Sequence, residues 1–158
     1  VKLKDKNASY NIIQKKTSWN SAGYGLYYHH TNDRWLIEYT STTSSDGSAT
    51  AQKSNVGMTI PLDEWYFICF THNDSGDDVQ YQASSSDTAL TVATHSDAKV
   101  DIASSTNSVI IGSGSGGTNG KTAVNFSGQL DGFTIYNKTL DATEVLRNFK
   151  ATKGSHRN

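Results

Sequence analysis

The aromatic and polar side chains between residues 17 and 34 are those whose types and spacing could bind a ligand. An aromatic ring stacks on the apolar face of a sugar, while amide, imidazole and guanidinium groups hydrogen-bond its hydroxyl groups. One loop and the hairpin after it supply all of these groups. The residues that we predict to contribute to glycan binding are Trp19, Asn20, Tyr24, Tyr27, His29 and Arg34.

The same aromatic side chains have an alternative role in a hydrophobic core. Trp35 and Trp65 fit this role because each lies in a strand-like stretch of apolar residues. Trp19 and Tyr27 fit either role, since large amphipathic side chains occur both in cores and at contacts. His29 and His30 are neighbours on an expected strand, so they point to opposite faces and do not form a joint metal pair.

The spacing required for catalysis is missing. A retaining glycosidase needs two carboxyl groups about 5 Å apart, and Glu38, Glu64 and Glu144 are widely separated in the chain. No serine lies in the strand–turn–helix context of a nucleophile elbow. The acidic run at Asp74, Asp77 and Asp78 does not have the spacing of a calcium-binding helix–loop–helix, and we interpret it as a solvated hairpin turn. We therefore expect no enzyme.

The composition excludes two further classes of function. The 158 residues carry a net charge of −1, and the lysines are scattered along the chain, so no basic footprint for nucleic acid or an anionic membrane is present. No apolar run approaches the ~20 residues that cross a bilayer. A single cysteine, Cys69, cannot form an internal disulfide, and its apolar surroundings predict a buried, inert thiol.

Short strands must position these residues. Residues 24–30 and 34–40 form the clearest hairpin, with Trp35, Ile37 and Tyr39 on one face. Residues 65–70 are all apolar, which is typical of a strand buried on both faces. The pattern predicts an all-β fold with one helix at the carboxyl end.

The stretch of residues 124–151 contains that helix. Its first half alternates apolar and polar residues and predicts a strand over 126–136. In its second half, Asp141 can cap the helix while Glu144 reaches back to the cap, and Leu140 and Val145 are placed for a hydrophobic staple. We expect this helix to dock on the strand before it.

The motif in this stretch resembles the laminin-G-like, or concanavalin A-like, jelly-roll domains. It reads Phe126-x-Gly128-x-Leu130-Asp131-Gly132-Phe133-x-Ile135-Tyr136-Asn137, followed by Leu140, Glu144 and Val145. The resemblance implies a two-sheet antiparallel jelly-roll sandwich with one short C-terminal helix, in which residues 1–158 form a single domain and 126–136 form the closing strand. Family members normally begin with a strand pair ahead of residues 1–5. We therefore expect a fragment that lacks its N-terminal strands and leaves an open sheet edge.

The resemblance also bears on metal binding. Related jelly rolls can hold a structural calcium at an acidic residue before the closing strand, and the matching position is Asp131. Calcium takes six to eight oxygen ligands, and the strands that would supply the others are those missing here. The alternative is that Asp131 caps a bend. Calcium at Asp131 is the one cofactor that the sequence raises.

Two functions follow from the resemblance. The first is a non-catalytic module that binds a glycan or cell-surface ligand within a larger viral or phage structural or adhesion protein. The second is a structural component of a virion or fibre, whose partners are other subunits. The run of residues 148–154 is similar to the ends of such domains in phage and viral structural proteins, which places the chain on a virion or extracellular surface. A jelly-roll glycoside hydrolase is a third reading, without the carboxylate pair that it requires.

Overall fold

The computed structural model describes residues 1–17, 21–41, 50–53, 58–95, 101–113 and 125–156. They form ten strands, two 3-10 helices and one α-helix. The strands are β1 (Lys2–Leu3), β2 (Tyr10–Gln14), β3 (Tyr24–His29), β4 (Arg34–Ser41), β5 (Thr50–Lys53), β6 (Tyr66–Thr71), β7 (Asp78–Ser84), β8 (Thr91–His95), β9 (Ile110–Ile111) and β10 (Gly128–Gln129). The helices are η1 (His30–Asn32), α1 (Ala142–Thr152) and η3 (Lys153–His156).

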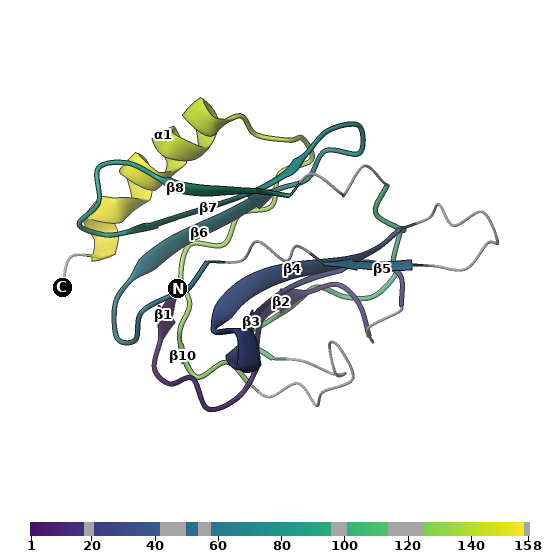
Figure 1. Cartoon of the computed structure of the whole chain (residues 1–158), viewed down its shortest axis with the longest axis horizontal. Helices are drawn as coiled ribbons and strands as arrows, with labels where there is room; N and C mark the ends of the chain where they lie inside the picture. Colours follow the sequence, from purple (N-terminus) through teal and green to yellow (C-terminus); the bar gives the residue numbers. More distant parts are fainter. Residues whose placement is uncertain (18–20, 42–49, 54–57, 96–100, 114–124, 157–158) are drawn as a thin grey trace.

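Two antiparallel sheets face each other, and α1 covers the outer side of one of them (Figure 1). The larger sheet has the order β5-β4-β3-β2-β9, and the smaller has the order β6-β7-β8. The short strands β1 and β10 pair with each other at the side of the sandwich. The predicted fold, a two-sheet antiparallel jelly-roll sandwich with one short C-terminal helix, is confirmed.

The β3–β4 hairpin supplies much of the core. Trp35, Ile37 and Tyr39 lie on its inner face, and each is 6% exposed or less. Two of these side chains also bridge the sheets, because the Trp35 indole donates to Gln82 Oε1 at 2.8 Å and the Tyr39 hydroxyl donates to Asp78 Oδ2 at 2.6 Å. Large rings therefore fill the sandwich while their polar ends find partners, as buried tyrosine and tryptophan require.

The helix begins as predicted and docks elsewhere than predicted. The Asp141 carboxylate accepts from the Glu144 N–H at 2.8 Å, and the Glu144 carboxylate accepts from the Asp141 N–H at 3.2 Å, which completes a capping box. Val145 and Phe149 are buried against the three-stranded sheet, where the Phe149 and Phe67 rings lie 5.6 Å apart. The prediction that the helix docks on the strand before it was wrong, because the three-stranded sheet offers the helix an apolar outer face.

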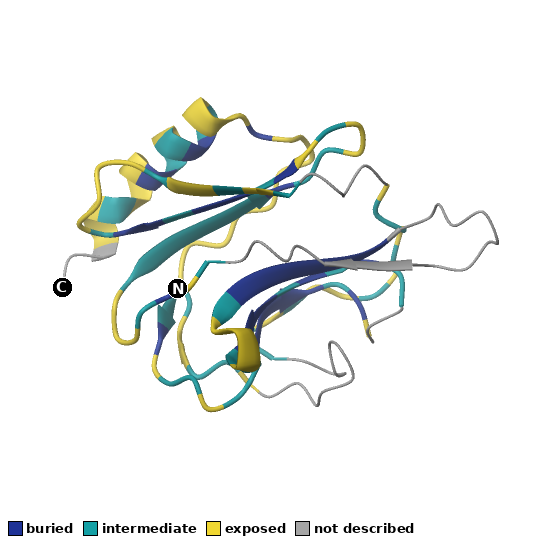
Figure 2. Ribbon diagram, in the orientation of Figure 1, coloured by how far each residue is buried: buried dark blue, intermediate teal, exposed yellow. Residues whose placement is uncertain are grey.

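The predicted closing strand is only partly formed. Of residues 126–136, Gly128–Gln129 pair with β1, and the segment that follows is exposed (Figure 2). Phe133 and Ile135 are 39% and 60% exposed. Alternating apolar residues bury one face only beside a neighbouring strand, and no strand among the described residues pairs with 131–136.

Candidate functional site

The β3–β4 hairpin separates the predicted ligand-binding residues onto two faces. His29 lies opposite Arg34 and Tyr27 opposite Leu36, on the outer face of the five-stranded sheet. Tyr24 lies on the inner face opposite Tyr39, where it borders a small cavity of about 210 Å³. Trp19 and Asn20 lie outside the described residues. The structure thus brings Tyr27, His29 and Arg34 together on one face, and their role in binding stays a prediction.

Accessible polar groups of this hairpin lie at its end, in residues 30–34, which we call the hairpin tip. Thr31, Asn32 and Asp33 are exposed, and His30 and Arg34 are half-buried. Together they present a hydroxyl, an amide, a carboxylate, an imidazole and a guanidinium group. Tyr27 and His29 lie behind the tip and are 1% and 6% exposed.

Hydrogen bonds hold the hairpin tip in shape. The Asn32 N–H donates to His29 Nδ1 at 3.3 Å, and Arg34 Nε donates to the Asn32 carbonyl at 3.2 Å. Asp33 has a left-handed backbone, with φ of 47°, and its carboxylate accepts from Lys6 and Tyr28 at 2.5 and 2.8 Å. Desolvation raises the pKa of Asp33, but these two hydrogen bonds outweigh it and leave the pKa below its usual value.

A buried polar cluster supports the same face further along the strands. Lys16 Nζ and Glu38 Oε1 lie 2.9 Å apart, and their side chains are 1% and 0% exposed. The Tyr27 hydroxyl donates to Glu38 Oε2 at 3.4 Å, while burial and the Glu38 carboxylate both raise the pKa of Tyr27. Sequence reasoning did not select Lys16 or Glu38. The sequence did contain one sign that Glu38 is unusual: this charged residue lies between Ile37 and Tyr39 in a stretch rich in apolar and aromatic residues.

The outer face of β4 does not supply a pair of catalytic carboxylates. Its positions are Arg34, Leu36, Glu38 and Thr40, and the position opposite Glu38 on β3 is Gly25. A retaining glycosidase needs its second carboxyl group about 5 Å away. Glu38 instead accepts hydrogen bonds from the Lys16 ammonium group and the Tyr27 hydroxyl.

Residues 1–146 match a laminin G-type family described as the concanavalin A-like lectin/glucanases superfamily. The chain belongs to this superfamily. No curated protein and no solved structure gives a significant match. The name of the superfamily includes both lectins and glucanases, so membership is compatible with either carbohydrate binding or carbohydrate hydrolysis.

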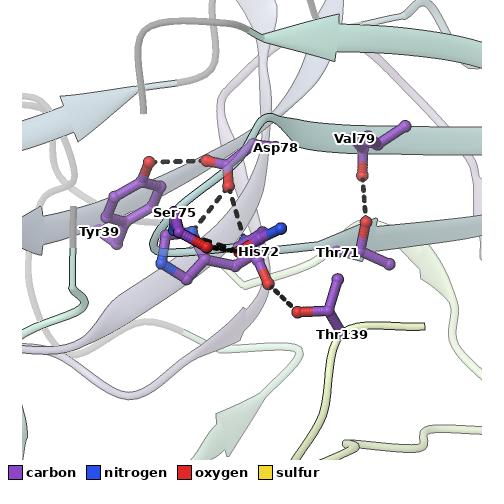
Figure 3. A network of polar contacts seen from close by, with 8 residues as sticks. Tyr39, Thr71, His72, Ser75, Asp78, Val79 and Thr139 are labelled. Atoms are coloured by element: carbon purple, nitrogen blue, oxygen red, sulfur yellow. Dashed lines mark hydrogen bonds and ion pairs between the residues drawn. The ribbon is translucent and has the colours of Figure 1, made fainter. Parts of the chain in front are cut away.

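A second polar network in this concanavalin A-like domain joins the two sheets (Figure 3). The Asp78 carboxylate accepts from the Tyr39 hydroxyl at 2.6 Å and lies 2.7 Å from His72 Nδ1. The His72 carbonyl in turn accepts from the Thr139 hydroxyl at 2.5 Å, which ties the segment before α1 to this network. The interpretation of Asp74, Asp77 and Asp78 as a solvated turn is wrong for Asp78, which is 0% exposed because it bridges the sheets.

Among the described residues, no cluster of metal-binding side chains surrounds Asp131, where calcium was predicted. Asp131 is exposed, and no group of three or more histidine, cysteine, aspartate or glutamate side chains gathers there or elsewhere in the described parts of the chain. Burial lowers the pKa of the Val1 α-amino group to about 6. The charge of the Asp131 carboxylate opposes that shift, since it favours the protonated amino group. Calcium binding stays a prediction.

A large groove opens beside β6 on the side of the sandwich where β1 and β10 lie. Its volume is about 1080 Å³, and apolar residues of both sheets line it together with residues 131–140.

No described helix has the length and apolar character needed to cross a membrane.

Proposed function

We propose that this concanavalin A-like domain is a non-catalytic recognition module that binds a glycan or a cell-surface ligand. The observation that carries the proposal is the hairpin tip, where five adjacent residues present five different polar groups. Sugars are recognised by such mixtures, since each hydroxyl group both donates and accepts hydrogen bonds. The parent would be a larger viral or phage structural or adhesion protein, exposed on a virion or another extracellular surface.

The construction of the hairpin supports this proposal. Binding is precise when its polar groups sit on rigid elements whose own side chains are locked by packing. Behind the hairpin tip, Tyr27 and His29 are buried and the Lys16–Glu38 ion pair fixes the same face of the sheet. Arg34 Nε and the Asn32 carbonyl are already hydrogen-bonded, so little conformational entropy is lost when a ligand binds.

The absence of hydrolysis is part of the proposal. The outer face of β4 carries one carboxylate, and that carboxylate is paired with Lys16. One oxygen of Glu38 accepts from Lys16 and the other from the Tyr27 hydroxyl, so both are engaged in contacts within the fold.

The test is a glycan array probed with the domain, followed by titration of the best ligand. We expect Arg34→Ala to weaken binding by about tenfold or more, because one charge-assisted hydrogen bond is worth about 1.5–3 kcal/mol. The matched control is Arg147→Ala, which removes an exposed arginine from α1 and leaves binding unchanged. No binding to any glycan at millimolar concentration, or equal binding by both variants, contradicts the proposal.

A second candidate function is a structural part of a particle or fibre, with other subunits as partners. Large exposed apolar side chains within one short segment favour it, because Phe133, Ile135 and Tyr136 are 39%, 60% and 46% exposed. Apolar side chains on a surface mark association sites when they gather. Failure to bind glycans, combined with loss of particles when the domain is deleted, would select this function over the first.

A further inference from the structure

His29 closes the turn of the hairpin tip through its side chain. It is the N-cap residue of η1, with an extended backbone (φ −108°, ψ 106°), and its Nδ1 accepts from the Asn32 N–H at 3.3 Å. A backbone N–H can only donate, so Nδ1 carries no proton. In a neutral imidazole one ring nitrogen accepts and the other carries the proton. The hydrogen bond therefore fixes His29 as the neutral tautomer that is protonated at Nε2.

Protonation of His29 is incompatible with this hydrogen bond. Both ring nitrogens of an imidazolium are donors, so a proton on Nδ1 would face the Asn32 N–H with no acceptor between them. His29 is also 6% exposed, and a buried charge is costly unless it is paired. Histidine is the side chain whose charge ordinarily changes between about pH 5 and pH 8. The cap of the hairpin tip is therefore open to control by pH.

The groups beside His29 oppose a positive charge on its ring. The Tyr27 ring lies 6.2 Å from the His29 ring along β3, and the His30 ring of η1 is stacked on it at 6.1 Å. Arg34 lies directly opposite His29 on β4. Arg34 is cationic and His30 can become so at acidic pH, and like charges at short distance disfavour one another.

The hydrogen bonds at the other end of the tip keep their form over the same pH range. The Asp33 N–H donates to the His30 carbonyl at 3.3 Å, and the Thr59 hydroxyl donates to the Asp33 carbonyl at 2.7 Å. The Asp33 carboxylate accepts from Tyr28, which points to the face opposite His29 because neighbouring strand residues alternate. The pKa of Asp33 lies below its usual value, so this carboxylate stays ionised.

His30 differs from His29 in the effect of a proton. Its Nδ1 lies 3.2 Å from the Ser9 hydroxyl, and its Nε2 lies 3.4 Å from the Thr31 hydroxyl. A hydroxyl group can either donate or accept, so both contacts persist when His30 becomes charged. Of the two histidines in the hairpin, His29 is the one whose protonation removes a hydrogen bond.

We propose that His29 is a positioning residue that holds the hairpin tip in the observed shape only while its imidazole is neutral. The cap is present above the pH at which His29 is half-protonated and is lost as the pH falls through it. Arg34 Nε donates to the Asn32 carbonyl, so release of Asn32 also frees the guanidinium group. The consequence for recognition rests on the proposed function: glycan binding weakens as the pH falls.

The test measures amide hydrogen exchange of Asn32 in the ligand-free domain at pH 8 and pH 5, on either side of the usual range of histidine. We expect the protection of this amide, relative to an unfolded chain, to fall about fivefold at pH 5. That change corresponds to the loss of one hydrogen bond of about 1 kcal/mol. Asparagine caps helices and does not titrate, so His29→Asn should keep the protection at both pH values.

Two further variants complete this measurement. His29→Ala has no side-chain acceptor, and we expect it to leave the Asn32 amide weakly protected at both pH values. The matched control is His30→Gln, which removes the neighbouring histidine and should retain the fall seen in the wild-type protein. Exchange at Gln80, on the central strand of the three-stranded sheet, reports whether each variant is folded.

Glycan affinity at the same two pH values is the second measurement. We expect the wild-type protein to bind about fivefold more weakly at pH 5, in proportion to the lost cap, and His29→Asn to show a ratio close to one. The ratio is taken within each variant, so a change in affinity at pH 8 does not affect it. Absence of glycan binding overturns the proposed function, whereas exchange at Asn32 decides the role of His29 without a ligand.

Three results overturn the proposal. In the first, the Asn32 amide of the wild-type protein is protected equally at pH 8 and pH 5. In the second, its protection falls equally in the wild-type and His29→Asn proteins, so that another group causes the change. In the third, glycan affinity has the same pH ratio in these two proteins, which removes the link between the cap and recognition.

Discussion

Lys16 and Glu38 form an ion pair that is almost completely withdrawn from water. Their side chains are 1% and 0% exposed, and Lys16 also lies 3.5 Å from the Thr40 hydroxyl. Removing two charges from water costs several kcal/mol per ion, and their attraction repays this only when both are present. The pair therefore acts as a unit that fixes the segment after β2 against β4.

Removing one charge of this pair should lower the free energy of unfolding much more than removing both charges. We expect Lys16→Met to lower the free energy of unfolding by about 3–5 kcal/mol, because it leaves the Glu38 carboxylate buried without its partner. The double variant Lys16→Met/Glu38→Leu should recover most of that loss, since two apolar side chains of similar volume replace the charges. Urea unfolding of the three proteins measures this. A double variant no more stable than Lys16→Met would contradict the interpretation.

At the scale of elements, α1 depends on its first turn. Asp141 and Glu144 satisfy each other's backbone N–H groups, while Leu140, Val145 and Phe149 are buried. Propensity alone does not hold an eleven-residue helix, because isolated helices of this length are marginal in water. Capping and docking on the three-stranded sheet have to act together.

We expect Asp141→Ala to lower the free energy of unfolding by about 1 kcal/mol, which is typical for loss of an N-cap. Arg147→Ala, on the exposed side of the same helix, is the control and should change stability by less than about 0.5 kcal/mol. Thermal or urea unfolding gives both values. An equal effect of the two substitutions would show that the capping box does not stabilise the folded domain.

The sequence predicted strands and caps better than it predicted which faces meet. The β3–β4 hairpin, the strand β6 and the capping box at Asp141 follow from local pattern and spacing, and all are present. The prediction that residues 65–70 are buried on both faces was wrong, because β6 is the outer strand of its sheet and its residues 66–70 are only half-buried. On β7, however, Val79 and Tyr81 face α1 while Asp78 and Gln82 face the five-stranded sheet. Alternation identifies two faces of a strand, but only the tertiary arrangement decides what covers each.

The same limit applies to the candidate site. Aromatic and polar residues predicted a binding site in the segment from Trp19 to Arg34. The hairpin places Tyr27, His29 and Arg34 on one face. Period-two alternation could have separated Tyr24 from them. The position of Glu38 on an aromatic strand was a visible signal, but its pairing with Lys16 could not have been predicted, because the register of β2, β3 and β4 brings the two together.

At the scale of the whole molecule, Asp5 links segments that are far apart in the chain. Its carboxylate accepts from the Ser127 hydroxyl at 2.5 Å and also from the Tyr10 hydroxyl. Ser127 directly precedes β10, and Tyr10 begins β2. One carboxylate therefore connects the segment after β1 and the residue before β10 to the five-stranded sheet.

These contacts predict a defined pH dependence of stability. The hydrogen bond from Ser127 is the largest cause that lowers the pKa of Asp5 below its ordinary value of 3.8, and the bonds from Tyr10 and the Asn7 N–H add to it. A carboxyl group whose pKa is lower in the folded state stabilises that state above its unfolded pKa. This contribution is present at neutral pH and is lost as the pH falls through the lowered pKa.

We expect Asp5→Asn to lower the free energy of unfolding at pH 7 and to have progressively less effect as the pH approaches 3. The difference between the wild-type and Asp5→Asn proteins isolates this group from other carboxylates that titrate in the same range. Asp101→Asn, which changes an exposed aspartate, is the control for the general effect of removing one negative charge. Urea unfolding at several pH values gives each difference. A constant difference between pH 7 and pH 3 would contradict the prediction, since these hydrogen bonds lower the pKa only if they favour the ionised carboxylate over the protonated one.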